Sequence, residues 1–126
     1  MRLLKILMIL WFLAAGCSDG SENVVGVAPV DSIEILILES FPVQVMIIAR
    51  GSLPDSCTEI GNITQMREGN TFLVAIETLR DPDLICAQVT VPFQESVSLD
   101  VEGLPAGTYV VDVNGVRDSF VLAIDN

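Results

Sequence analysis

The 126-residue sequence contains no histidine, and its only lysine, Lys5, lies near the amino terminus. Hydrolases and acyl-transfer enzymes usually place a histidine or a lysine beside the nucleophile, where it acts as the base. These absences argue against most hydrolytic mechanisms. We therefore expect a protein that is not an enzyme, with no catalytic residues and no cofactor.

Positive charge is scarce throughout the chain. Beyond residue 5 the only cations are four arginines, against 17 acidic residues in the whole sequence: Arg50, Arg67, Arg80 and Arg117. An acidic surface of this kind repels the phosphates of nucleic acids, so we expect no nucleic-acid partner. The simplest role of the acidity is solubility, and an acidic docking surface is the alternative.

Residues 1–16 begin with positive charge and continue as an apolar run. Arg2 and Lys5 precede or flank the run, which ends at Leu13, and the small residues Ala14-Ala15-Gly16 follow. This order is typical of a secretory signal peptide. The run is too short for a permanent transmembrane helix, which needs about 20 residues. We expect the segment to be removed after export.

The residues Ala14-Ala15-Gly16-Cys17 resemble the lipobox of bacterial lipoprotein signal peptides. In such lipoproteins the cysteine is acylated, with fatty acids such as palmitate, and becomes the mature amino terminus. The resemblance implies lipidation of Cys17, with ordinary signal-peptidase cleavage near Gly16 as the alternative. It also implies an extracytoplasmic protein that is lipid-anchored to the cell or outer membrane, with residues 17–30 as a tether.

Cys57 and Cys86 are the other two cysteines. An even pair in an exported chain predicts a disulfide, because the compartment is oxidising. The disulfide would close a loop of 30 residues, counted from Cys57 to Cys86. On the chain-entropy view, closing a loop of this length contributes about 3.6 kcal/mol of stability. A metal site is the rival interpretation, but the chain has no histidine or further cysteine to complete tetrahedral coordination.

Residues 31–126 are a succession of short β-branched runs separated by turn residues, which predicts an all-β domain. The expected strands are 32–39, 42–50, 59–66, 71–78, 84–91, 96–102, 108–114 and 116–124. Their number and spacing resemble a single immunoglobulin-like β-sandwich of seven or eight mostly antiparallel strands. The segment Gly103 to Tyr109, followed by Asn114-Gly115, is similar to the closing hairpin of many bacterial immunoglobulin-like and fibronectin-like modules.

Apolar patterning differs between the two halves of this domain. In the second half, apolar and polar residues alternate from Val97 to Asn114, and Asn114-Gly115 predicts a type I′ hairpin turn before Phe120, Leu122 and Ile124 on the dry face. In the first half, Ile33–Leu38 and Val43–Ile48 are apolar at nearly every position. This predicts central strands or strands covered on both faces, and an apolar face kept for a partner is the alternative.

Two carboxylates flank a proline in Asp81-Pro82-Asp83. With Glu77 or Asp55 they could supply oxygen ligands to calcium. A turn closed by its own aspartate hydrogen bonds is the simpler interpretation, because the spacing does not match a calcium-binding loop.

Two functions remain open from the sequence. The first is a membrane-anchored binding or structural module of the cell envelope, with an envelope protein as partner, that acts through sheet faces or end loops. The second is a secreted protease inhibitor, because inhibition needs only rigid exposed loops and a disulfide near residues 53–56 would stiffen one. The glycine-rich and tryptophan-bearing loop motifs of chagasin-like inhibitors are not found in the sequence.

Overall fold

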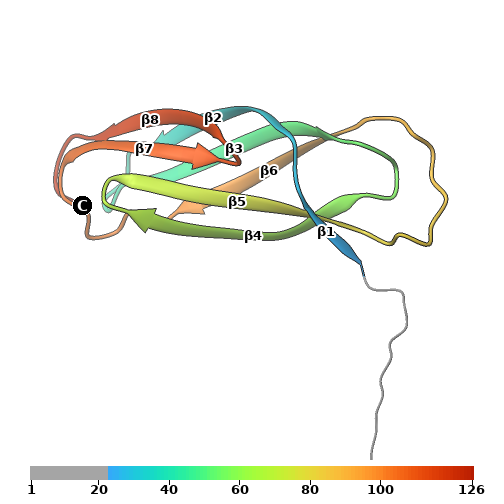
Figure 1. The fold of residues 1–126 in the computed structure, drawn as a ribbon. Helices are drawn as coiled ribbons and strands as arrows, with labels where there is room; N and C mark the ends of the chain where they lie inside the picture. The colour runs from blue at the N-terminus through green and yellow to red at the C-terminus, as the bar shows by residue number, and fades with distance from the viewer. Residues whose placement is uncertain (1–22) are drawn as a thin grey trace, which may run out of the picture.

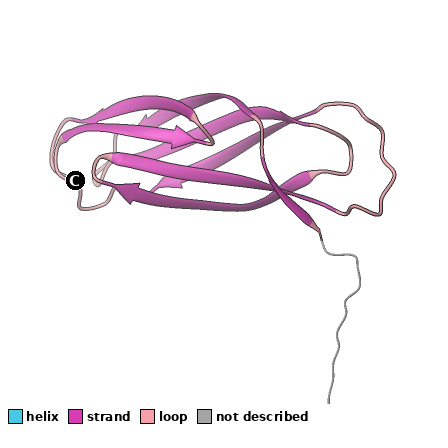
Figure 2. Ribbon diagram, viewed as in Figure 1, coloured by secondary structure: helices cyan, strands magenta, loops and turns pink. Residues whose placement is uncertain are grey.

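A computed structural model describes residues 23–126, which form an all-β sandwich of eight strands (Figure 1; Figure 2). Its strands are β1 (Val24–Val27), β2 (Val30–Leu38), β3 (Gln44–Leu53), β4 (Glu59–Glu68), β5 (Thr71–Arg80), β6 (Val91–Leu99), β7 (Gly107–Val113) and β8 (Val116–Leu122). No helix within these residues is long and apolar enough to cross a membrane. The expected signal peptide and Cys17 lie outside the described residues.

Two sheets make up the sandwich. The smaller sheet has the order β2-β3-β6, and the larger one contains β4, β5, β7 and β8 in that order, with β1 also paired to β5. Every pair is antiparallel except β5 with β7, which run parallel. The expected all-β sandwich of mostly antiparallel strands is confirmed.

The core lies between the sheets and follows the alternation of the strands. In β3, for example, Val45, Ile47 and Ala49 are buried, while the residues between them are partly exposed. The centre holds an aromatic cluster of Phe72, Tyr109 and Phe120, with ring centroids 5.6 to 6.1 Å apart. Offset and tilted aromatic pairs at such distances pack favourably.

Tyr109 also fixes the corner through which the chain enters β7. Its hydroxyl group donates a hydrogen bond of 2.6 Å to the carbonyl oxygen of Pro105. A tyrosine that bonds back to the chain just before its own strand is a feature of immunoglobulin-like sandwiches, where it is called the tyrosine corner. The bond satisfies the one polar atom of a side chain that is otherwise fully buried.

Asn114 joins two strands that share one edge of β5. β7 pairs with the first half of that edge and β1 with the second half. Between them, the Asn114 side chain accepts a hydrogen bond from Ile76 N–H (3.0 Å) and donates to the carbonyl oxygens of Ala28 (2.8 Å) and Ile76 (2.9 Å). Asn114 and Gly115 both have positive φ, at 50° and 95°, so the predicted type I′ turn is confirmed.

Several expected boundaries were wrong. The expected strand 84–91 is wrong, because residues 81–90 are a loop and β6 begins only at Val91. The range 17–30, expected as a tether, contains β1 and the first residue of β2. Both corrections have the same physical cause, because an apolar run pairs only where a partner edge is free, and the sequence pattern does not show that edge.

The two apolar runs 33–38 and 43–48 were expected in central strands or in strands covered on both faces, and only the second of them lies in a central strand. β3 is the central strand of its sheet, but β2 lies at the edge and leaves Ile37 and Leu38 exposed. Ile124, expected on the dry face, follows the end of β8 and is likewise exposed. These apolar side chains gather at one end of the sandwich.

Candidate functional site

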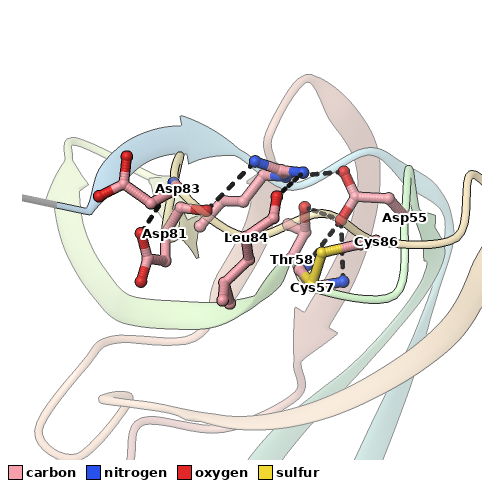
Figure 3. Close-up of polar contacts among 8 residues, drawn as sticks. Asp55, Cys57, Thr58, Asp81, Asp83, Leu84 and Cys86 are labelled. Carbon is pink, nitrogen blue, oxygen red and sulfur yellow. Dashed lines mark hydrogen bonds and ion pairs between the residues drawn. A yellow bond between two sulfur atoms is a disulfide. The ribbon is translucent and has the colours of Figure 1, made fainter. Parts of the chain in front are cut away.

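The loop of residues 81–90 extends beyond the sheets at the end of the molecule opposite the marked carboxy terminus (Figure 1). We call this region the loop end: the loop 81–90, the turn 55–58 and strand β1. The disulfide between Cys57 and Cys86 ties the loop to the turn (Figure 3). Their Cα atoms lie 5.8 Å apart, within the usual range for disulfides. The predicted pairing is confirmed.

Asp55 organises the turn beside the disulfide. Its Oδ1 accepts hydrogen bonds from the Thr58 hydroxyl (2.8 Å) and from the backbone N–H groups of Cys57 (2.9 Å) and Thr58 (2.8 Å). Its Oδ2 accepts one from Arg80 Nε at 3.0 Å, which forms an ion pair. These contacts, with the Thr58 hydroxyl as the largest, hold the pKa of the Asp55 carboxyl below its ordinary value of 3.8.

Arg80 then reaches into the loop. Its guanidinium donates to the carbonyl oxygens of Asp81 (3.2 Å) and Leu84 (3.4 Å). On the other side of Cys86, the N–H of Ser56 donates to the carbonyl oxygen of Ala87 (3.2 Å). The backbone is therefore held on both sides of the loop tip. Two carbonyl groups of the segment 84–90 are thus bonded outside any sheet, that of Ala87 to the turn and that of Leu84 to a side chain.

Two of the carboxylates considered as alternative calcium ligands, Asp55 and Asp81, have hydrogen-bond partners within the protein. Asp55 binds Arg80, and Asp81 Oδ1 accepts a hydrogen bond from the N–H of Asp83 (2.9 Å), which closes an aspartate turn (Figure 3). Among residues 23–126, no group of three acidic or cysteine side chains is placed to hold a metal ion. The hydrogen bond from Asp83 to Asp81 confirms the simpler interpretation of Asp81-Pro82-Asp83, a turn closed by its own hydrogen bonds.

The tip of the loop is apolar and open to solvent. Ile85 is fully exposed, at 101% of its reference area, and Leu84 and Val89 are about half exposed. From Leu84 to Phe93 the sequence carries no charge. A fixed, exposed apolar tip of this kind contributes nothing to the core, which makes it a candidate for recognition.

The opposite end carries a second apolar surface, which we call the groove end. A groove of about 360 Å³ lies between the end of β2 and the end of β8. Its lining residues are Ile37, Glu39, Ser40, Val43, Val121, Leu122, Ala123 and Ile124. Phe41, in the neighbouring turn, is 75% exposed. An adjacent hollow of about 410 Å³ also includes Val43 and adds the carboxylates of Asp100 and Glu102.

Asn126 closes the groove end. Its side chain accepts a hydrogen bond from the N–H of Val43 (2.7 Å) and donates to the carbonyl oxygens of Val43 (2.9 Å) and Val101 (3.1 Å). Its own N–H donates to the carbonyl oxygen of Leu104 (2.8 Å). The sequence indicated Asn114 only as a turn residue and Arg80 only as a cation, and it gave no sign of the role of Asn126. For Arg80 the local signal was its place directly before Asp81-Pro82-Asp83.

Comparison with known proteins places this fold in a family. The family model for the ORF11 beta-sandwich domain matches residues 47–122. The chain belongs to the ORF11 beta-sandwich domain family. The match begins within β3 and extends to the end of β8, so it includes both the disulfide turn and the loop 81–90, whereas β1 and β2 lie before it.

Curated relatives come from Herpetosiphon aurantiacus. An uncharacterized 10.2 kDa protein in the HgiBIM 5′ region is 36% identical over 83 residues, which cover 66% of this chain and all of the relative. Another, in the HgiCIIM 5′ region, is 33% identical over 93 residues, which cover 74% of this chain and 98% of the relative. No solved structure matches the chain. These relatives support the family assignment, and their names give no activity.

Proposed function

We propose that this protein is an extracytoplasmic lipoprotein, anchored through Cys17, that acts without catalysis as a binding or structural module of the cell envelope. The arrangement of residues 1–17 supports the anchor, and a disulfide is what an exported chain would carry. The observation that carries the binding role is the groove end, because it gathers exposed apolar side chains at the end of the sandwich away from β1, the strand nearest Cys17 in sequence.

The chemistry of the groove end defines its protein partner. Ile37, Val121 and Ile124 supply apolar contacts, and Phe41 stands exposed beside them. Carboxylates lie in and next to the groove: Glu39, Asp100 and Glu102. A complementary partner is an envelope protein that offers apolar side chains flanked by lysine or arginine.

The anchor is tested by Cys17→Ser in the full-length precursor. We expect the variant to lose acyl labelling and to leave the membrane fraction, because the lipid is its attachment. The oxidation state of Cys57 and Cys86 is the control for export, since an oxidised pair shows that the variant reached the oxidising compartment. Unchanged membrane retention of the exported variant would contradict the anchor.

The groove is tested by photo-crosslinking in cells. A benzophenone side chain at position 41 should give a discrete protein adduct, which mass spectrometry can identify. The same side chain at position 66 is the matched control, because Met66 is also a large exposed apolar residue but lies outside the groove. Equal labelling from both positions, or none from position 41, would contradict the assignment of the groove.

Protease inhibition is the second candidate, and one observation favours it. Ile85 is fully exposed, next to a disulfide cysteine, and the carbonyl groups of Leu84 and Ala87 on its two sides are held by hydrogen bonds. A rigid exposed segment loses little conformational entropy when it enters a protease cleft. A panel of endopeptidases should then be inhibited by the wild-type protein but not by Ile85→Asp. Unchanged protease activity across the panel would count against this role.

A further inference from the structure

The chain enters the folded domain at the loop end. Asn23, the first described residue, lines a small hollow of about 90 Å³ together with Cys57, Leu79 and Leu84. β1 begins beside the loop end, while the marked carboxy terminus lies at the other end of the sandwich (Figure 1). Five residues separate Cys17 from Asn23. The six residue-to-residue steps that join them span about 20 Å at most. A lipid on Cys17 would therefore keep the loop end close to the membrane.

The same end carries a concentration of exposed apolar side chains. Of the twelve large apolar residues that are exposed in the described part of the chain, six lie on β1 and on the loop 81–90: Val24, Val25, Val27, Leu84, Ile85 and Val89. The loop is already fixed by the disulfide and by Arg80. Its insertion into an apolar phase would therefore cost little ordering entropy.

The acidic residues of the loop end determine which lipid headgroups it can approach. Asp81 and Asp83 stand at the base of the loop, and Glu59 lies beside Leu79 on the neighbouring strand. Arg80, the cation closest to the loop tip in sequence, is paired with Asp55. A surface of this composition is repelled by anionic headgroups and makes its favourable contact through apolar side chains alone.

We propose that the loop end rests on the phospholipid bilayer, with Ile85 and Leu84 inserted at the boundary between headgroups and acyl chains. The proposal rests on the lipid anchor of the proposed function and adds a second, non-covalent contact with the membrane. The lipid surface is the occupant because the anchor brings it within reach of the loop. The sandwich then stands with the groove end turned away from the membrane, about 30 Å further out for a ten-residue strand such as β5.

Tryptophan fluorescence tests the contact. Trp11 is the only tryptophan of the chain and lies in the segment removed on processing, so a single introduced tryptophan reports on its own position. Ile85→Trp is the reporter, and Val121→Trp is the matched control, since Val121 is an exposed apolar residue at the groove end. The processed, full-length lipoprotein is reconstituted into phosphatidylcholine vesicles with and without brominated acyl chains.

We expect the emission of the Ile85→Trp variant to shift to shorter wavelength and to be quenched by bromine, and the emission of the Val121→Trp variant to do neither. The quenching should weaken when phosphatidylglycerol is added, because of Asp81 and Asp83. The tryptophan introduced at position 85 could itself drive insertion, so a second reporter, Val89→Trp, is used with the natural Ile85 in place. Adding Ile85→Asp to the Val89→Trp variant should reduce the quenching of the tryptophan at position 89.

The possible failures are distinguishable. A protein that neither floats with the vesicles nor carries an acyl mass on Cys17 would contradict the lipid anchor and with it the proposed function. A protein that floats, but whose reporters at positions 85 and 121 behave alike, would overturn the bilayer contact and leave the anchor intact. The tryptophan at position 85 could also be shielded in native membranes but not in pure lipid vesicles. That result would overturn the bilayer contact and show that the loop end binds a membrane protein.

Discussion

The two ends of the sandwich are held in place by different interactions. The loop end lies beyond the core and is fixed by the Cys57–Cys86 disulfide and by the ion pair of Asp55 with Arg80. The groove end lies next to buried residues such as Leu122 and is closed by the neutral hydrogen bonds of Asn126. The comparison indicates that a segment without core contacts needs covalent and charged links to keep one conformation, whereas packing and neutral hydrogen bonds hold a segment next to the core.

Removing the disulfide should have the largest effect on stability. The double variant Cys57→Ala, Cys86→Ala avoids a free thiol and should lose about 3.6 kcal/mol of unfolding free energy on the chain-entropy view. Urea denaturation of the processed protein measures the loss. If the free energy of unfolding did not change, the claim that the loop end depends on its covalent link would be wrong.

At the groove end, Asn126→Ala should cost about 1 to 3 kcal/mol, because it leaves backbone groups of Val43 and Val101 without their partners. The same urea experiment applies. Ile124→Ala is the control, since Ile124 is exposed and close in sequence, and it should change little. Equal losses from the two variants would show that the Asn126 amide is not the closing contact.

Acid should weaken the loop end selectively. The pKa of Asp55 is lower in the folded protein than its ordinary value of 3.8, so its ionised form stabilises the fold above that pH. This contribution is lost as the pH falls below 3.8 and through the folded pKa. Asp55→Asn should unfold at a lower temperature at neutral pH and lack this part of the acid dependence.

Thermal unfolding followed by circular dichroism across acidic pH measures this difference. Thr58→Val serves as a graded control, because the Thr58 hydroxyl is the largest cause of the lowered pKa and its loss should reduce the acid dependence only in part. An Asp55→Asn curve parallel to the wild-type curve at every pH would contradict the assignment.

Ile85→Asp should have the smallest effect on stability. The side chain is fully exposed, so the free energy of unfolding should stay within about 0.5 kcal/mol of the wild type. Val121→Asp makes the same change at the groove end and should behave alike in urea. A clear loss from Ile85→Asp alone would mean that Ile85 packs against the protein and is not free for recognition.

The sequence predicted what depends on local pattern. The pattern after Val97 located β7 and β8 and the last four residues of β6. Asn114-Gly115 located the tight turn between β7 and β8, and the even cysteine pair located the disulfide. It did not predict the edge position of β2, because an apolar run looks the same in a central strand and in an edge strand whose outer side chains form a surface.

The strand expected over residues 84–91 was the larger error, and it has a specific cause. Ile85, Ala87 and Val89 alternate with polar residues as they would in a strand. In the structure, however, the carbonyl oxygen of Ala87 accepts a hydrogen bond from Ser56, and that of Leu84 accepts one from Arg80. Those partners lie far away in the sequence or act through a side chain, so no window of residues reveals them. The same holds for Asn114 and Asn126, whose amides bind strands distant along the chain.

Hydrogen exchange of the membrane-bound protein tests the contrast between the loop end and the groove end most directly. The protein bound to phosphatidylcholine vesicles through the proposed lipid on Cys17 is compared with the Cys17→Ser variant in the absence of vesicles. Amide exchange is read by mass spectrometry at both ends at once. The account predicts slower exchange at residues 84–90 in the vesicles, with no change at 38–43 and 121–124. Slower exchange at the groove end, with the loop end unchanged, would contradict it.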